Sequence, residues 1–208
     1  MDNDEQALSP EEMLRLIEQQ ETATVSRLAP NPVPHYLAWG VAWFVGFGAF
    51  FLRDGLSGTP YLAIPLGVTL ALLFGLMALA MVVSAMTMWQ LGSPVRGASQ
   101  QRGTMYGFSW AFGFLAMWMI GVRFGPSLPI PEQGLLWSSL SMMVVAVLYM
   151  AGGAVWLVRP MFVLGAGVAV LNAVGTAAGP GWHALLMSVG AGGGSIIAGF
   201  VLRRRMRR

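Results

Sequence analysis

The 208-residue chain contains no cysteine and no lysine, and only 10% of its residues are charged. The absence of cysteine excludes disulfides, iron–sulfur clusters, thiolate zinc sites and cysteine nucleophiles. Soluble domains carry about 25% charged residues, so this chain has too few polar groups to cover a water-soluble fold. Hydrophobic residues make up 56% of it. They are gathered in blocks of the length, about 20 residues, that crosses a bilayer as a helix.

Acidic residues are almost absent after residue 21, where only Asp54 and Glu132 occur. All twelve basic residues are arginine, and five of them fall within residues 203–208. This basic run directly follows an apolar block, so it is typical of a juxtamembrane anchor for anionic lipids rather than of a nucleic-acid site. The predicted anchor, the Arg tail, consists of Arg203, Arg204, Arg205, Arg207 and Arg208.

The first 34 residues form a polar, acidic segment. Ser9, Pro10 and Glu12 match a capping box with proline at the first helical position, which predicts an imperfectly amphipathic helix over about 10–28. The prolines near residue 33 end it. An acidic start does not match a signal peptide, which needs a basic region and an early apolar run. We therefore expect this segment to stay attached and to lie in the cytoplasm.

The remaining apolar blocks predict an all-α, polytopic membrane bundle over residues 35–202, closed by the cytoplasmic tail 203–208. Six transmembrane helices are expected, at about 36–52, 61–88, 104–122, 134–157, 161–178 and 183–202.

Arginine placement predicts the orientation of these spans. With the N-terminus inside, the cytoplasmic segments hold ten arginines, whereas the outer loops hold only Arg53 and Arg123. Positive residues favour the cytoplasmic side, so both ends are expected there, in the cytoplasmic (inner) membrane. Tryptophan and tyrosine prefer the headgroup level, and the following aromatics fall at predicted span ends: Tyr36, Tyr61, Trp89, Tyr106, Trp137, Trp156 and Trp182.

A short pattern in the first span recurs in the third. Trp43, Gly46, Phe47 and Ala49 are repeated 67 residues later as Trp110, Gly113, Phe114 and Ala116. The pattern is consistent with a parallel repeat of two-helix units. Reuse of glycine and aromatic residues in unrelated membrane helices explains it equally well.

Residues 40–48 in the first span and 106–110 in the third resemble a family of small multi-span bacterial membrane proteins with no assigned activity. Some members of that family are loosely called transporters or permeases. The resemblance implies the six-span topology and leaves the mechanism open.

Enzymatic chemistry is not expected from these residues. No aspartate or glutamate falls within a predicted span, so the usual proton-coupling carboxylate is missing. His35 and His183 are predicted at opposite membrane faces, so they do not form a shared metal or haem site, and we expect no cofactor. Ser195 lies twelve residues from His183 on one helix, about 18 Å along the axis, which is beyond the reach of a nucleophile–base pair. We interpret His183 as an interfacial residue bonded to backbone or lipid headgroups, with ligand binding at the outer face as the alternative.

Small and polar residues line one face of each of the last two spans. Their helical spacing predicts a seam between spans five and six, in which small residues let the backbones approach closely. One interpretation is tight packing of this hairpin with Asn172 hydrogen-bonded across it. A second is a polar pathway or pocket, and a third is an oligomer interface. The candidate residues are Asn172, Thr176, His183, Ser188 and Ser195.

The sequence leaves two functional classes open. In the first, the chain is a small transporter or permease component that acts alone, as a homo-oligomer or with a partner transporter subunit. Alternatively, it is a membrane scaffold or regulatory subunit whose N-terminal helix recruits a cytosolic partner. The lipid bilayer is its expected environment, with anionic lipids at the cytoplasmic face and no nucleic acid.

Overall fold

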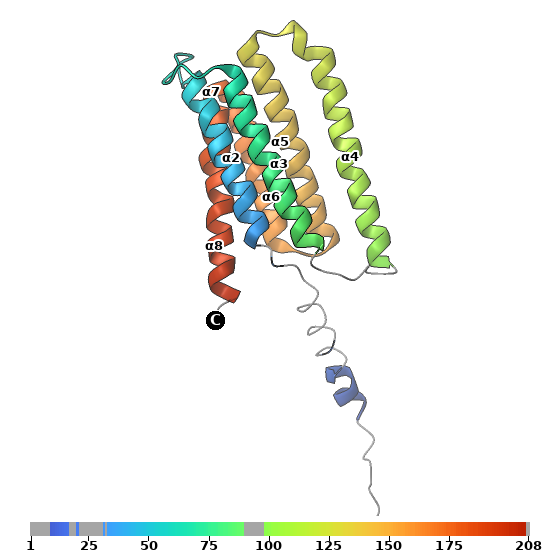
Figure 1. Ribbon diagram of the computed structural model, residues 1–208. Coiled ribbons are helices and arrows are strands. Elements are labelled where there is room, and N and C mark those ends of the chain that lie inside the picture. Colours follow the sequence, from blue (N-terminus) through green and yellow to red (C-terminus); the bar gives the residue numbers. More distant parts are fainter. Residues whose placement is uncertain (1–8, 17–19, 21–30, 32, 90–97, 207–208) are drawn as a thin grey trace, which may run out of the picture.

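The computed structural model describes residues 9–16, 20, 31, 33–89 and 98–206 (Figure 1). Within these residues, six helical segments are long and apolar enough to cross a membrane. The predicted all-α class and number of spans are confirmed to that extent. The helices are α2 (Val33–Asp54), α3 (Leu66–Trp89), α4 (Ala98–Phe124), α5 (Ile130–Val155) and α6 (Arg159–Ala178). The sixth span joins α7 (Pro180–Leu186), the π-helical segment η2 (Met187–Gly193) and α8 (Gly194–Met206).

The second span begins later than predicted, at Leu66 instead of residue 61. Proline disfavours a helical conformation in the residue before it, so the helix starts after Pro65. The preceding residues form a turn, in which the backbone N–H groups of Tyr61 and Leu62 both donate to the carbonyl of Leu52, each at 2.9 Å.

The predicted capping box at the N-terminal helix is present. The Ser9 backbone N–H donates to Glu12 Oε2 at 2.9 Å, and the Glu12 N–H donates to Ser9 Oγ at 3.2 Å. Helix is described over residues 10–16 and at Gln20. The rest of the predicted amphipathic helix, and its boundary near residue 28, lie outside the described residues.

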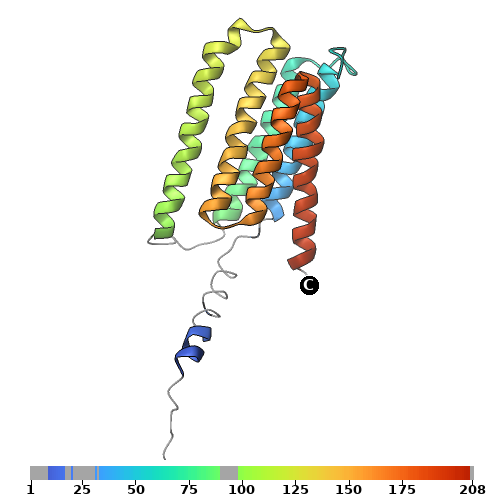
Figure 2. The ribbon, with the colours of Figure 1, turned by 180° about the vertical axis from the view of Figure 1, so that it is seen from behind.

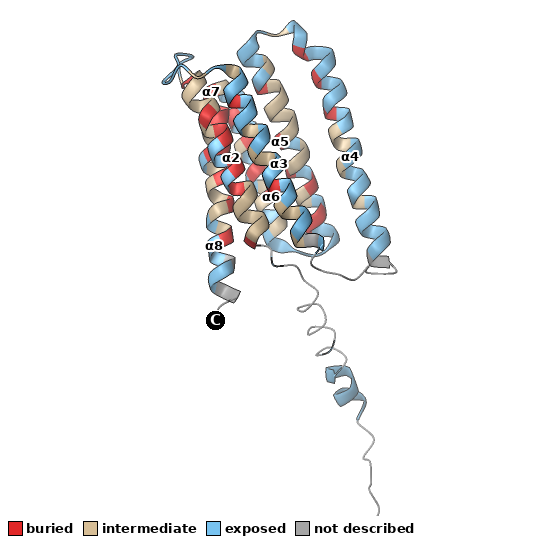
Figure 3. Cartoon of the chain, in the orientation of Figure 1, coloured by how far each residue is buried: buried red, intermediate tan, exposed pale blue. Residues whose placement is uncertain are grey.

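Helix α2 lies between α3 and the sixth span and packs against both (Figures 1 and 2). Helix α5 packs extensively on α6 and also supports α4, which lies at the edge of the bundle (Figure 1). Buried residues are red in Figure 3, and the largest cluster of them lies where α2, α5, α6 and the sixth span meet. This core contains Trp43, Phe47, Met142, Ala146, Val168, Met187 and Ala191.

Close helix approach depends on small residues at defined points. A Cβ added to Gly192 would meet the Phe44 backbone, and one added to Gly40 would lie 2.9 Å from the Ile196 backbone nitrogen. The sixth span therefore packs backbone to backbone on α2, as small residues allow in membranes, where lipid removes the hydrophobic drive for association.

The repeated pattern of spans one and three has a partial structural counterpart. A Cβ at Gly46 would meet Leu73 on the next helix, and one at Gly113 would meet Val144 on the next helix. The two glycines thus make equivalent contacts. Their neighbouring aromatics differ, since Trp43 is buried in the core and Trp110 is half-buried at the edge.

Candidate functional site

A buried polar cluster joins α5, α6 and α7 near the Asp54 end of the bundle. His183 and Asn172 are only 1% and 8% exposed. His183 Nε2 lies 2.8 Å from Asn172 Oδ1, which can only accept, so Nε2 carries a hydrogen and donates. Asn172 Nδ2 donates to the Ser139 carbonyl at 2.9 Å, and the Ser138 hydroxyl lies 3.4 Å from His183 Nδ1. We call these four residues the His183 cluster.

Helix periodicity explains how α6 contributes to this cluster. Its buried face consists of Gly165, Val168, Asn172 and Gly175, which are spaced three, four and three residues apart. A Cβ at Gly175 would lie 2.8 Å from His183 Cα. Glycine at 175 therefore lets α7 approach closely enough for the imidazole to reach Asn172.

Several sequence predictions about the seam are decided by these contacts. Asn172 is hydrogen-bonded across the span five/six hairpin, as the packing interpretation predicted. His183 is buried in the protein and bonds to the Asn172 side chain, not to backbone or lipid headgroups as expected. Thr176 is exposed, because the inward face of α6 passes through Gly175 instead.

The small face of the sixth span also differs from its predicted position between spans five and six. The Ser188 hydroxyl donates to the Phe44 carbonyl of α2 at 2.7 Å. A Cβ at Gly199 would meet Leu37, again on α2. Ser195, which is buried, bonds to the Ala191 carbonyl of its own helix at 2.8 Å. This face therefore packs largely against span one.

The sixth span contains a π-helical segment, Met187–Gly193, that was not predicted. Such segments are rare and occur frequently at functional sites. The sequence signal is the run of glycine at 190, 192, 193 and 194, residues that tolerate unusual backbone geometry. The segment begins four residues after His183, and its Met187 is fully buried.

A second polar cluster, also not predicted, lies near the Arg-tail end of α2. The Ser84 hydroxyl donates to the Ala80 carbonyl at 2.8 Å, so it accepts from Trp39 Nε1 at 3.0 Å and from His35 Nδ1 at 2.8 Å. His35 Nε2 then accepts from the Tyr149 hydroxyl at 3.3 Å. We call His35, Trp39, Ser84 and Tyr149 the His35 cluster. The sequence feature that could have indicated this cluster is the presence of the polar residues Ser84 and Tyr149 within otherwise apolar spans.

Apolar side chains fill the interior between the two clusters. Trp43 packs on Trp39 with ring centroids 5.9 Å apart, and Phe47 meets the His183 ring at 6.1 Å. Met142 of α5 and Met187 of η2 complete the same core. The two histidines therefore lie in separate clusters on either side of a packed apolar plug, which we define as Trp43, Phe47, Met142 and Met187.

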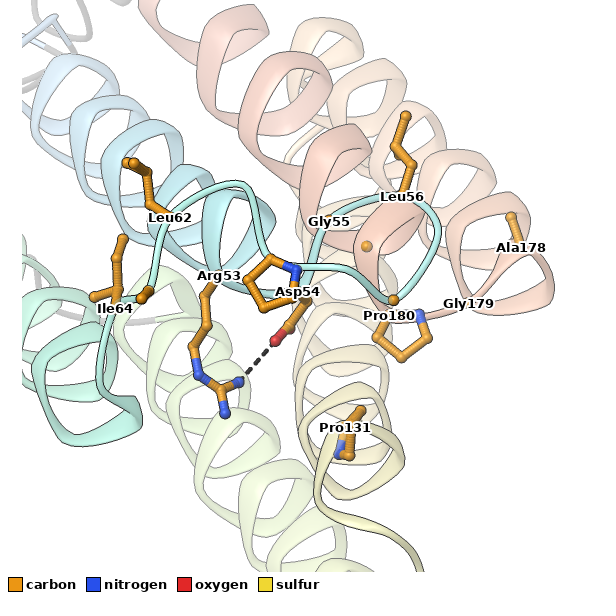
Figure 4. A pocket seen from close by; sticks show the side chains of 14 residues that line it. Arg53, Asp54, Gly55, Leu56, Leu62, Ile64, Pro131, Ala178, Gly179 and Pro180 are labelled. Carbon is orange, nitrogen blue, oxygen red and sulfur yellow. Dashed lines mark hydrogen bonds and ion pairs between the residues drawn. The ribbon is translucent and has the colours of Figure 1, made fainter.

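An open pocket of about 380 Å³ lies at the Asp54 end, where the α2–α3 loop meets the α6–α7 turn (Figure 4). It contains Arg53 and Asp54, whose Nη1 and Oδ1 atoms are 2.7 Å apart. We call it the Arg53 pocket. None of the five candidate seam residues lines it.

The Arg tail begins within α8, where Arg203 and Arg204 are exposed. Arg205 belongs to the same helix, whereas Arg207 and Arg208 lie outside the described residues. Among the residues that the structure describes, no three histidine, aspartate or glutamate side chains are grouped to hold a metal ion.

No protein-family model, curated protein or solved structure matches the chain. Its six apolar helices are compatible with a multi-pass membrane protein.

Proposed function

We propose that the chain is a small, non-enzymatic transporter or permease component of the cytoplasmic membrane, with both ends in the cytoplasm. The observation that supports this most is the buried, hydrogen-bonded His183 cluster directly beside a π-helical segment. Ionisable residues within membrane spans are costly and usually mark substrate or ion pathways.

The proposed path runs from the Asp54 end past the His183 cluster towards the His35 cluster. Each cluster offers hydrogen-bonding groups at one end of the bundle, and the apolar plug separates them. Such an arrangement suits alternating access, in which a solute reaches one side at a time.

The π-helical segment is the proposed moving element. It carries Met187, one of the plug residues, and Ser188, which bonds to the Phe44 carbonyl. Conversion of π to α geometry would rotate these side chains relative to α2 and open the plug. Glycine at 192 and 193 lowers the steric resistance to that change.

The natural absence of cysteine provides a direct test. Ser188→Cys puts a single thiol about 12 Å along the sixth span from Pro180, next to the plug. In right-side-out vesicles, we expect slow but complete reaction with a membrane-impermeant, positively charged thiosulfonate. Opening of the path is what brings water and reagent to this buried position.

Val170→Cys is the matched control, since its side chain is 63% exposed on α6 and lies about 12 Å along that helix from Ala178, at a depth similar to that of Ser188. Lipid should shield it from a charged reagent, with full reaction after solubilisation in denaturing detergent. If Ser188→Cys stays unmodified in vesicles but reacts fully after denaturation, the plug does not open and the transport proposal fails.

A scaffold or regulatory subunit is the second candidate, and the capped first turn at Ser9 and Glu12 favours it. A defined helix start next to an acidic surface suits recruitment of a cytosolic partner, while the Arg tail holds anionic lipid at the membrane. Mild-detergent purification from native membranes separates the candidates. A stoichiometric partner that is lost on deletion of residues 1–28 supports the scaffold, whereas purification alone or as a homo-oligomer supports a self-sufficient transporter.

A further inference from the structure

The Arg53 pocket contains an ion pair whose two side chains make no other described hydrogen bond. Arg53 and Asp54 are adjacent in the chain, and their side chains are only 22% and 17% exposed. Asp54 is also the last residue of α2, where the helix dipole disfavours a negative charge. A carboxylate held in an unfavourable position is often there for function.

The two side chains keep unused hydrogen-bonding capacity. Arg53 has five N–H donors, and its described hydrogen bond is the one from Nη1 to Asp54 Oδ1. Asp54 likewise has a second oxygen, Oδ2, for which no described residue is a partner. The pair therefore presents free cationic donors and a free anionic acceptor side by side.

The other side chains that line the pocket are apolar. In Figure 4, the pair lies between Leu62 and Ile64 on one side and Pro131 and Pro180 on the other. Gly55 adopts a left-handed φ of 63°, a conformation that glycine takes readily. The loop is held by the hydrogen bonds from the Tyr61 and Leu62 N–H groups to the Leu52 carbonyl, and a loop ordered before binding lowers the entropic cost of binding.

We propose that the Arg53 pocket binds a zwitterionic group, one that carries a phosphate or carboxylate together with an ammonium. The anionic part would accept from the free Arg53 N–H groups, and the ammonium would donate to Asp54 Oδ2. Charge-assisted hydrogen bonds of this kind are roughly twice as strong as neutral ones.

Charge balance selects this ligand class over simple ions. The pocket is open, and it holds one positive and one negative side chain that are 22% and 17% exposed. A singly charged ligand that pairs with one of them is repelled by the other, which carries the same sign of charge as the ligand. A zwitterion keeps the site neutral and pairs both of its ends.

Two sources supply such a group: the ethanolamine headgroup of a phospholipid, and a free small zwitterion such as an amino acid. The site lies apart from the proposed transport path, and equilibrium binding tests it without any flux. Its failure is therefore distinguishable from failure of the transport proposal.

The test measures binding to the purified full chain in detergent by calorimetry. The probes are glycerophosphoethanolamine, which carries one negative and one positive charge like the lipid headgroup, glycine, ethanolamine and inorganic phosphate. We expect at least one of the two zwitterions to bind at least tenfold more tightly than either single ion. Native mass spectrometry then compares retention of phosphatidylethanolamine with phosphatidylglycerol, which identifies the headgroup source.

Variants localise the site. Arg53→Gln and Asp54→Asn should each weaken zwitterion binding about tenfold or more, because each removes one charge-assisted contact. Arg123→Gln removes an exposed arginine at the end of α4 and should bind like the parent chain. Arg53→Lys keeps the charge and should retain most of the affinity, which separates loss of the contact from loss of the fold.

Saturable binding of a zwitterion that is lost in Arg53→Gln and kept in Arg123→Gln supports the proposal. Retention of phosphatidylethanolamine alone, with the same variant pattern, supports it through the lipid source. The proposal is overturned if no zwitterion or zwitterionic lipid binds below about 10 mM, or if Arg53→Gln binds as tightly as the parent chain.

Discussion

Asn172 accepts a hydrogen bond of 2.8 Å from His183, a residue eleven positions away on the following span. This bond ties α6 to the first helical turn of the sixth span, immediately before the π-helical segment. His183 is thus an ionisable side chain within the bundle, and its described hydrogen-bond partners lie on the neighbouring helices α5 and α6.

Replacing Asn172 with leucine should destabilise the bundle. The His183 Nε2–H would lose its acceptor within an apolar region, and such a loss costs about 1–2 kcal/mol in membrane proteins. The free energy of unfolding in lipid nanodiscs measures the effect. Thr176→Leu, one turn away and exposed, is the control and should change that value by less than about 0.5 kcal/mol. Equal effects of the two substitutions would show that the hydrogen bond contributes nothing specific.

Ser84→Ala should also destabilise the fold, because it removes the acceptor shared by His35 and Trp39. Two half-buried donors would then lack this partner, at a cost of about 1–2 kcal/mol. Thr87→Ala is the matched control on the same helix, since the Thr87 hydroxyl bonds to the Val83 carbonyl of its own helix. Thermal unfolding of both variants in one detergent gives the comparison, and a lower midpoint for Thr87→Ala than for Ser84→Ala would contradict the described network.

The sequence predicted the six apolar helices well, because blocks of about 20 apolar residues are visible in the local composition. A hydrogen bond of Asn172 across its hairpin was one of three interpretations of the seam, and the structure contains it. It did not predict that Ser188 bonds to α2, because the order of helices around the bundle axis is not encoded in local spacing. The burial of His183 depends on the same tertiary arrangement, in which Gly175 admits α7. The π-helical geometry is likewise set by packing, although its glycines were visible.

Gly192→Ala should disturb the contact between the sixth span and α2, since the added Cβ would meet the Phe44 backbone. The Phe44 backbone cannot shift without distorting α2, so we expect the free energy of unfolding to fall by about 1–3 kcal/mol. Gly193→Ala, its neighbour in the π-helical segment, meets no atom within 4 Å and should be neutral or stabilising by up to about 1 kcal/mol. Unfolding of the two variants side by side tests this, and a neutral Gly192→Ala would contradict the close approach.

The capping box predicts a pH-dependent N-terminal turn. Hydrogen bonds from the Ser9 backbone N–H and, to a smaller extent, from the Ser9 hydroxyl lower the pKa of Glu12 below its ordinary value of 4.5. Because the folded-state pKa is lowered, the cap stabilises the turn above pH 4.5 and is lost as the pH falls through the lower, folded value. NMR titration of the Glu12 carboxyl carbon in the full chain measures this. Ser9→Ala removes the hydroxyl but keeps the backbone N–H, so the pKa of Glu12 should rise only part of the way towards 4.5, and an unchanged titration would count against the hydroxyl contact of the cap.

Motion of the sixth span against α2 is the central claim, and one cysteine pair tests it most directly. A Cβ at Gly48 would lie 3.3 Å from Ser188 Oγ, close enough for Gly48→Cys and Ser188→Cys to form a disulfide. Hydrogen–deuterium exchange of residues 183–195 is then compared between the oxidised and reduced double variant in nanodiscs. We predict that oxidation slows exchange there about tenfold or more, because the disulfide prevents the opening, while exchange in α4 stays unchanged. Identical exchange in the oxidised and reduced forms would show that the sixth span does not move away from α2, and would contradict the account.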